Sequence, residues 1–582
     1  SCGDCPRNET ACLADHCVSA DGQRRGILTA NRQMPGPTIQ VLFPTKCLND
    51  PFIFHPLLTR QFPYIYIYWV GKFIHDITAY GDNDRFIVHK CCASEKEHAT
   101  LFQQRRLHVF FNHAGDDVSN GIFGALIVKQ ADIRDPHRAL YDVDDSSHVI
   151  LVSQWQHSGE ITFTDGHAKP AILLVNGRGR QPNGPRVPLT KFTVLPGRRH
   201  RFRLANAGGA GSCPITVLVD AHPLLLIALD GQPVEPRQVA SITLAKGERA
   251  DFVLKANKRI ASYWINVHTS KECGASSING GAILNYKGSS TEDPLPAAEA
   301  VQQPEAEESN DRIAMTTNPA DKCGNPESLC VMEVHSLRKM PSGLGKPKTD
   351  VTVRLPINYK LQTNDIVDLI HWISGNGVET RILNVNNATF TYPSSPLLSQ
   401  GGDVSGETMC YSTPDEDDAR VENNETASLS SRRCRRSDAT ASNVCECVHV
   451  RYIPLGATVE IILLDQGTGG LDDLVYHLHG YTFYVVGARK FGRSVSLQEL
   501  KSMDDKGQLF SRNLDCTVAK DTVVVPKFGV VALRFKANNP GYWMLRDEHA
   551  AEWTRGLDVI LQVGETSDMV PAPEDFPKCG SF

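Results

Sequence analysis

The chain has 582 residues, a formal net charge of −6 and a sequence pI near 6.4. Since domains average roughly 100–200 residues, we expect about three or four of them. The weakly acidic balance gives no sign of a nucleic-acid partner, and no apolar run approaches the roughly 20 residues of a membrane-spanning helix. The partner therefore remains an unknown protein or small molecule.

The chain carries 17 cysteines, an odd number, so at least one thiol is free or pairs between chains in a disulfide-linked oligomer. Four lie at the N-terminus: Cys2, Cys5, Cys12 and Cys17. Three glycosylation sequons occur: Asn8, Asn387 and Asn424. Together these features predict a secreted, extracellular glycoprotein, whose start at Ser1 is typical of a mature chain. Cys2 and Cys5 also have zinc-like spacing, but no matching second half follows, which favours disulfides.

Short runs of β-branched and aromatic residues recur along the chain, separated by Gly, Pro, Asn and Asp. The predicted strands are 38–43, 64–70, 107–111, 124–128, 148–153, 192–195, 201–204, 215–219, 351–355, 366–371, 457–464 and 523–535. Helical periodicity is scarce. This pattern predicts an all-β protein made of sandwiches or barrels.

Two changes of composition predict boundaries. Residues 288–311 are rich in Ser, Pro, Ala and Glu and favour a linker. Residues 401–443 form a long polar insert whose paired arginines, at 432–433 and 435–436, could be a processing site. The alternative is a solvated loop held by disulfides to its own neighbours. Four cysteines could supply these bonds: Cys410, Cys434, Cys445 and Cys447.

The segment 476–481, Tyr-His-Leu-His-Gly-Tyr, carries the strongest chemical signal. In a strand, His477 and His479 project from one face because side chains alternate with period two. Gly480 then allows a close turn. Paired imidazoles suit a first-row transition metal, although an ordinary strand can also carry two histidines.

Several motifs resemble those of the multicopper oxidases, within the insect laccase branch. They run in the family's order at 25–29, 31–37, 120–128, 175–180, 196–203, 229–234, 247–252, 477–480, 520–523 and 539–543. The resemblance implies three cupredoxin-like Greek-key β-domains. We place them at 21–145, 146–287 and 346–582, with a Cys-rich segment at 1–20, a linker at 288–345 and the insert at 401–443 inside the third domain.

The same resemblance implies a blue copper site, held by a thiolate and two imidazoles, and a trinuclear cluster held by four His-x-His pairs. Residues that match the family's ligand positions differ sharply from this pattern. The first pair is replaced by Tyr68 and Val70. In the second pair Phe111 replaces the first ligand, and His113 remains. In the third motif Leu474 takes a blue-copper position, while His477 and His479 match cluster ligands.

The fourth motif, His-Cys-His in the family, reads Arg546-Asp547-Glu548 here, and a later blue-copper histidine corresponds to Glu552. Of the eleven ligands that the resemblance implies, His113, His477 and His479 remain. Aspartate is a hard oxygen ligand and does not replace a soft thiolate, and Arg546 puts a permanent cation at a copper position. Arg546 could pair with Glu548, two residues on.

These positions predict a multicopper oxidase-related protein that has lost most copper ligands and is not an active oxidase. No cofactor is expected, or at most one copper or zinc. We expect a binding or structural role. Two alternatives remain. The first is a mononuclear copper or zinc protein with weak oxidase activity at His113, His477 and His479, and the second is an extracellular storage or matrix protein.

Overall fold

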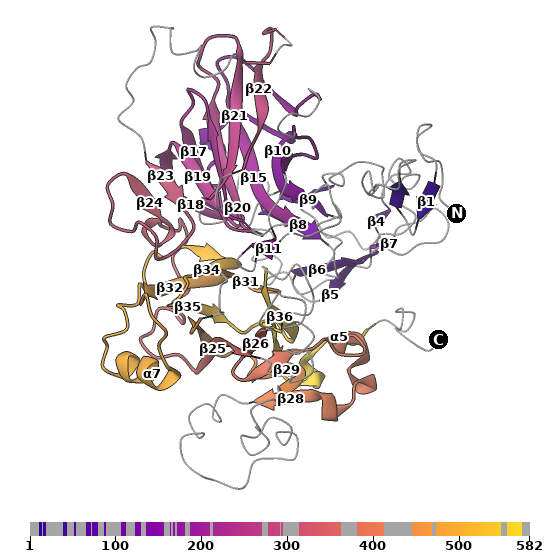
Figure 1. The fold of residues 1–582 in the computed structure, drawn as a ribbon, viewed down its shortest axis with the longest axis vertical. Coiled ribbons are helices and arrows are strands. Elements are labelled where there is room, and N and C mark those ends of the chain that lie inside the picture. The colour runs from indigo at the N-terminus through magenta and orange to yellow at the C-terminus, as the bar shows by residue number, and fades with distance from the viewer. Residues whose placement is uncertain are drawn as a thin grey trace, which may run out of the picture. The chain divides into compact units, whose positions relative to one another are not determined.

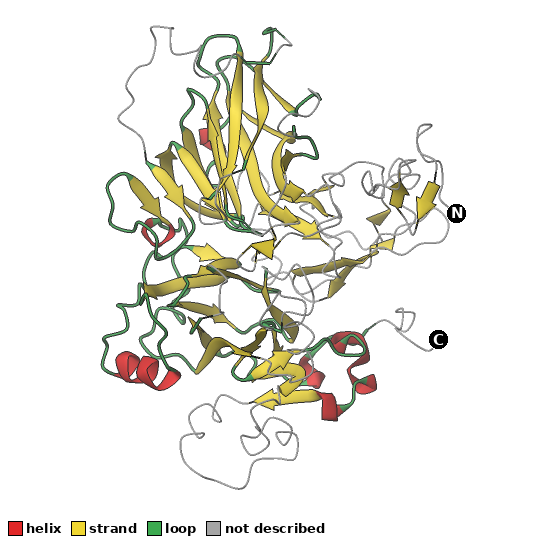
Figure 2. Cartoon of the chain, in the orientation of Figure 1, coloured by secondary structure: helices red, strands yellow, loops and turns green. Residues whose placement is uncertain are grey.

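The computed structural model divides the chain into two compact units: Ser1–Arg338 with Val518–Lys520, and Lys339–Thr517 with Asp521–Phe582. It describes side chains mainly over 123–127, 135–155, 172–180, 187–209, 213–270, 278–290, 313–359, 383–411, 446–467, 473–548 and 556–572. Elsewhere only short strands are described. Strands dominate throughout the described chain (Figures 1 and 2). This confirms the predicted all-β, cupredoxin-like fold class. No helix among the described residues is long and apolar enough to cross a membrane.

The N-terminal third of the first unit contributes short paired strands. They are β1 (Ala11–Leu13), β2 (His16–Val18), β3 (Ile39–Leu42), β4 (Phe52–Ile53), β5 (Tyr66–Val70), β6 (Phe73–Thr78), β7 (Ile87–Val88), β8 (Arg106–Phe111) and β9 (Phe123–Lys129). Strand β9 pairs with β3 in parallel and with β8 antiparallel. The predicted strands at 38–43, 64–70, 107–111 and 124–128 are therefore confirmed within one to two residues.

The rest of the first unit consists mainly of two larger sheets. The first has the order β13 (Ile172–Val175), β10 (Val143–Trp155), β15 (Arg199–Gly209), β20 (Arg249–Lys255), β17 (Leu224–Leu229) and β18 (Gln232–Val239). The second has the order β14 (Lys191–Val194), β22 (Asn279–Tyr286), β21 (Ser262–Thr269), β16 (Ile215–Val219), β19 (Ser241–Leu244), β23 (Ala314–Thr316) and β24 (Ser328–Cys330). A separate hairpin joins β11 (Phe163–Thr164) to β12 (His167–Ala168).

Aromatic side chains join the two larger sheets. Phe192 of β14 and Phe202 of β15 have ring centroids 5.9 Å apart, and Phe202 stacks on Phe252 of β20 at 5.5 Å. Residues of β16 alternate between buried and half-buried, as expected for a strand with one face toward a core.

Strands β23 and β24 lie inside the predicted linker 288–345, where the disulfide Cys323–Cys330 closes a short loop. Residues 314–316 and 328–330 of that segment are therefore part of a sheet.

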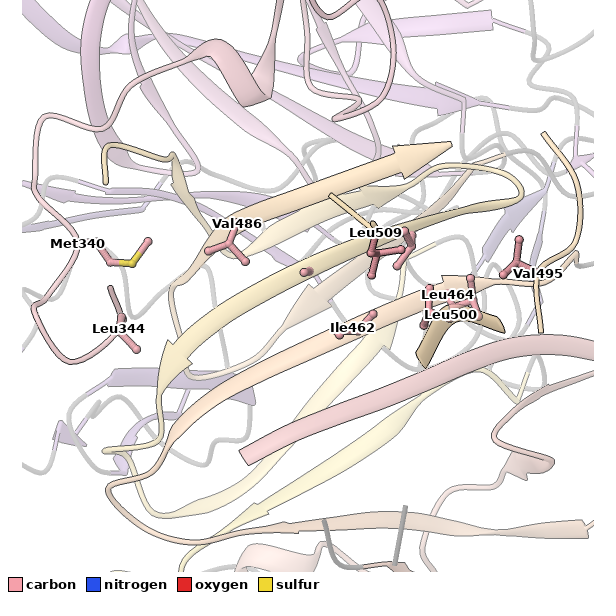
Figure 3. Close-up of a cluster of buried hydrophobic side chains, with 10 residues drawn as sticks. Met340, Leu344, Ile462, Leu464, Val486, Val495, Leu500 and Leu509 are labelled. Carbon is pink, nitrogen blue, oxygen red and sulfur yellow. The ribbon is translucent and has the colours of Figure 1, made fainter. Parts of the chain in front are cut away.

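The second unit is built on one long twisted sheet. Its strands are β25 (Val351–Leu361), β26 (Arg381–Val385), β27 (Ala388–Phe390), β28 (Met409–Ser412), β29 (Cys445–Ile453), β30 (Thr458–Asp465), β31 (Leu474–Leu478), β32 (Phe483–Lys490), β34 (Thr522–Val525), β35 (Gly529–Lys536), β36 (Gly541–Asp547) and β37 (Val559–Val563). The helices α5 (Leu397–Gln400) and α7 (Leu497–Asp505) flank it. Side chains of Ile462, Leu464, Val486 and Leu500 share one buried cluster (Figure 3).

The predicted strand 523–535 is two strands, and this prediction was wrong. Pro526 cannot donate to a sheet ladder, and Phe528 has a φ of 50°, so the chain turns between β34 and β35. The backbone N–H groups of Lys527 and Phe528 donate to Asp473 and Asp465, at 2.7 Å each. The predicted strand 366–371 lies outside the described residues.

The first residues of the predicted insert 401–443 are structured. Strand β28 pairs in parallel with β29, and the disulfide Cys410–Cys447 joins their ends. This bond confirms that the insert is tied by a disulfide to its own neighbourhood. Cys516 is a free thiol in a half-buried position, whereas a disulfide-linked oligomer stays a prediction.

Candidate functional site

Strand β31 carries His477 and lies between β34 and β36 in the second unit. In the antiparallel register with β36, Tyr476 faces Asp547 and His477 faces Arg546. On its other side, His477 faces Thr522 of β34. Because alternate residues share a face, His477 and Arg546 lie on one side of the sheet, and Tyr476 and Asp547 lie on the other.

The two histidines lie together, as their spacing predicts. Their ring centroids are 5.1 Å apart with an interplanar angle of 63°. The N–H of His479 donates to the carbonyl of Met544 at 2.9 Å, so the pairing with β36 continues beyond the end of β31. Gly480 then turns the chain with a φ of +75°, and a Cβ there would lie 2.5 Å from Cε3 of Trp543. The glycine is therefore required both by its backbone conformation and by the tryptophan.

A hydrogen-bond chain orients the ring of His477. The Thr522 hydroxyl donates to Oδ1 of Asp521 at 2.9 Å, so it can only accept from Nδ1 of His477, which is also 2.9 Å away. Oδ1 of Asp521 lies 3.5 Å from the same nitrogen. Nδ1 therefore carries the proton, and Nε2 of the neutral ring is the basic nitrogen. Metal-binding histidines are commonly held in this way.

His479 is held in its neutral form. Burial lowers its pKa well below the usual value, and the nearby His477 and Arg546 lower it further, whereas Asp521 acts in the opposite direction. A neutral imidazole is the form that binds a metal, so its protonation state would not prevent coordination.

Arg546 is 6% exposed and sits in an acidic environment. Burial alone would lower its pKa, but Glu548 and Asp558, followed by Tyr392 and Asp547, raise it. Glu548 is the largest of these favourable electrostatic contributions, which supports the predicted attraction between the two side chains. Nη1 of Arg546 also donates to the Tyr392 hydroxyl at 3.3 Å.

Asp547 and Asp558 form a buried acidic pair next to this arginine. The backbone N–H of Asp547 donates to Oδ1 of Asp558 at 2.9 Å, and the Tyr392 hydroxyl donates to its Oδ2 at 3.4 Å. Burial raises the pKa of Asp558 to about 7, and Asp547 and Glu548 raise it as well, while Arg546 and the Asp547 N–H oppose the rise. Asp558 therefore holds a proton at mildly acidic pH.

These residues do not fit a blue copper centre. Leu474, which the resemblance matches to one blue-copper ligand, is fully buried and offers no donor atom, and Asp547, which it matches to the thiolate, offers hard oxygen atoms. On the opposite face, His477 and His479 suit copper, but Arg546 brings a positive charge to the same face. The described residues contain no group of three His, Cys, Asp or Glu side chains that could hold a metal ion. His113 and Glu552 lie outside the described residues.

Three contributors were missed by the sequence reasoning: Tyr392, Asp558 and Thr522. Tyr392 follows β27, and Asp558 immediately precedes β37. Both residues lie near Arg546 only because the sheet folds, and no local sequence pattern predicts either of them. Thr522 belongs to a family-like motif at 520–523, which served only to support the resemblance.

A second buried charge cluster lies in the first unit and joins three of the family-like motifs. Nζ of Lys520 is 2.8 Å from Asp230 and 3.3 Å from Glu248, and all three side chains are fully buried. Burial raises the pKa of Glu248, whereas Lys520 lowers it. Lys520 therefore pairs by charge with residues of the motifs at 229–234 and 247–252.

The fold and these motifs define a cupredoxin-like oxidase architecture, and comparisons with known proteins agree. Two models described as multicopper oxidase match residues 146–289 and 414–566, together about half of the chain. The chain belongs to the multicopper oxidase family.

Similar proteins include fungal laccases. Laccase-1 of Fomitopsis schrenkii is 27% identical over 96% of this chain and 86% of its own length. The laccase of Trametes maxima is 26% identical over 98% and 95%. Among solved structures, the Botrytis aclada laccase has a TM-score of 0.54 at 18% identity, covering 93% of this chain and 84% of its own. Fet3p, a multicopper oxidase that functions in iron import, has a TM-score of 0.56 at 16% identity, covering 92% and 85%. These structures support the fold alone.

Proposed function

We propose that this chain is a secreted, laccase-like multicopper oxidase homologue that has lost most copper ligands and acts as a binding or structural protein. Within the family we place it beside the divergent members of the insect laccase branch, on the motifs quoted above. The observation that carries the proposal is the buried Arg546, which faces His477 from the neighbouring strand.

Charge explains why this one residue matters. A guanidinium stays protonated at every physiological pH, and here the pKa of Arg546 is raised further, against the effect of burial, by Glu548 and Asp558. A copper ion near His477 would meet a fixed positive charge at short range in a poorly solvated environment. The site therefore favours an internal ion pair over a bound cation.

The opposite face supports the same conclusion. Electron entry in a multicopper oxidase requires the soft thiolate of the blue copper site. Asp547 occupies that position, and it is engaged through its backbone with Asp558. Leu474 removes a second donor. A protein without these donors keeps the surfaces of the fold, and function then depends on what those surfaces bind.

The experiment is metal analysis of the secreted chain, purified without chelator, combined with its visible spectrum and oxygen uptake with a diphenol. The proposal predicts a colourless protein, substoichiometric copper and no oxygen uptake. Stoichiometric copper with diphenol-dependent uptake that His477→Ala abolishes would overturn it.

One observation favours a second candidate, a mononuclear copper or zinc protein. The ring of His477 is held through Nδ1 by Thr522 and Asp521, which leaves the basic nitrogen at Nε2, as in many metal ligands. One stoichiometric zinc or copper that is lost in His479→Ala would support this candidate. An abundant extracellular storage or matrix protein is the third reading, and non-reducing gel migration as a covalent oligomer would support it.

A further inference from the structure

Asn387 lies at the tip of a tight hairpin in the second unit. Asn386 and Asn387 connect β26 to β27 with φ values of 57° and 63°. Two successive residues at positive φ are typical of a type I′ turn, and asparagine tolerates this conformation better than most residues. Asn387 is exposed, so its amide is accessible in the folded protein.

The third residue of the same sequon, Thr389, is in the opposite situation. It is 6% exposed, and its hydroxyl donates to the carbonyl of Leu383 at 2.9 Å. The next residue, Phe390, donates its N–H to the carbonyl of Gly556 at 2.9 Å, and a Cβ at Gly556 would collide with the Thr389 methyl group. Folding therefore separates the acceptor asparagine, which stays accessible, from the hydroxyl that completes the sequon.

We propose that Asn387 carries an N-linked glycan that is attached before the β26–β27 hairpin folds. The reaction forms a bond between Nδ2 of Asn387 and the anomeric carbon of an oligosaccharide. The lipid diphosphate of the donor leaves and takes up the proton that the amide loses. The disulfides Cys323–Cys330 and Cys410–Cys447 are consistent with a chain that passes through the oxidising compartment where this donor is found.

The site is tested by secreting the full chain from eukaryotic cells and removing N-glycans enzymatically in isotopically heavy water. Conversion of Asn387 to heavy-labelled Asp, read by peptide mass spectrometry, is the expected result. The label should persist in Thr389→Ser, which keeps the sequon, and vanish in Thr389→Val, which has nearly the same shape. Asn387→Asp, which tolerates the turn, is the second variant in case the valine variant fails to fold. Its intact mass should be lower than that of the wild type by one glycan. An unlabelled Asn387 in the wild-type protein would overturn the proposal.

The order of events is tested on unglycosylated chain produced in bacteria. The folded protein and the reduced, unfolded chain are each offered to microsomal oligosaccharyltransferase with a lipid-linked oligosaccharide. We expect a glycan to be attached to Asn387 in the unfolded chain and none to be attached in the folded protein. Equal modification of both forms would contradict attachment before folding.

Discussion

His477 and Arg546 face each other across the antiparallel strands β31 and β36, on the same side of the sheet. Directly opposed residues in such a pair have Cβ atoms roughly 4.5–5.5 Å apart. The imidazole is held by Thr522 and Asp521, and the guanidinium is surrounded by Tyr392, Glu548 and Asp558. A strand position suited to a metal ligand thus holds a cation that is stabilised by its own set of acids.

Replacing this cation should improve metal binding. In Arg546→His, a third imidazole joins His477 and His479 on one face and the repulsion disappears. At about 5 Å and an effective dielectric constant near 20, the guanidinium repels each unit of charge on the metal ion by on the order of 3 kcal/mol. We therefore expect at least about a tenfold gain in zinc affinity. Titration calorimetry with zinc measures it, and Arg493→His on the exposed surface is the matched control. Equal affinity in all three proteins would contradict the role of Arg546.

The stability of the protein should decrease as pH rises toward neutrality because of Asp558. Its pKa is raised from 3.8 to about 7 in the folded state, so between these values the folded chain holds a proton that the unfolded chain has lost. The contribution of Asp558 to the free energy of unfolding is fully present below its pKa in the unfolded chain and is lost as pH rises through its pKa in the folded protein. The loss amounts to a few kcal/mol at most.

Asp558→Asn keeps an oxygen for the Asp547 N–H and removes the titration. Urea unfolding at several pH values should give a flatter profile between about pH 4 and 7 than the wild type. The control is Asp403→Asn, at an exposed position in the second unit. Parallel profiles for the wild type and Asp558→Asn would show that Asp558 is ionised throughout this range.

Removing the charge of Lys520 should be strongly destabilising. Its ammonium group is the shared partner of Asp230 and Glu248, which are both fully buried. Lys520→Met would leave their negative charges poorly compensated, at a cost of about 3–5 kcal/mol in the free energy of unfolding. The double variant Lys520→Met with Glu248→Gln should recover part of this loss. Exposed Lys506→Met is the control, and a similar small effect in both lysine variants would refute the prediction.

Gly480 should tolerate no side chain. Gly480→Ala would strain a φ of +75° and also place a Cβ 2.5 Å from Trp543. Gly492 provides a matched control, since its φ is +72° but a Cβ there would meet nothing within 4 Å. Both substitutions carry the backbone cost of about 1 kcal/mol, and only Gly480→Ala adds overpacking of about 1–3 kcal/mol. Equal losses in thermal stability would show that Trp543 moves away without cost.

Periodicity in the sequence predicts most of the described strands because each has one face toward a core. The strand 215–219 is an example, since β16 spans Ile215–Val219 and its residues alternate between buried and half-buried. The error at 523–535 came from treating one apolar run as one strand, although Pro526 interrupts the ladder. A proline inside an apolar run therefore predicts the end of a strand better than the hydrophobicity of the run predicts its continuation.

The candidate site was only partly predictable. The spacing of His477 and His479 places them on one face, and the structure confirms it. Tyr392 contributes through a hydrogen bond with Arg546, a residue 154 positions away in the sequence. Asp558 contributes through a pKa that burial raises. Neither the contact nor the burial can be predicted from the neighbouring sequence. The predicted role of His113 lies outside the described residues and stays a prediction, as do the domain boundaries and the glycans on Asn8 and Asn424.

The most direct test of the central claim is copper content, measured together with visible absorption on the secreted protein after incubation with copper and removal of excess metal. The proposed loss of the blue-copper donors, at the positions of Leu474 and Asp547, predicts no blue absorption band and no stoichiometric copper. A blue protein with stoichiometric copper would contradict the account, because it would require donors that the positions matched to the family do not supply.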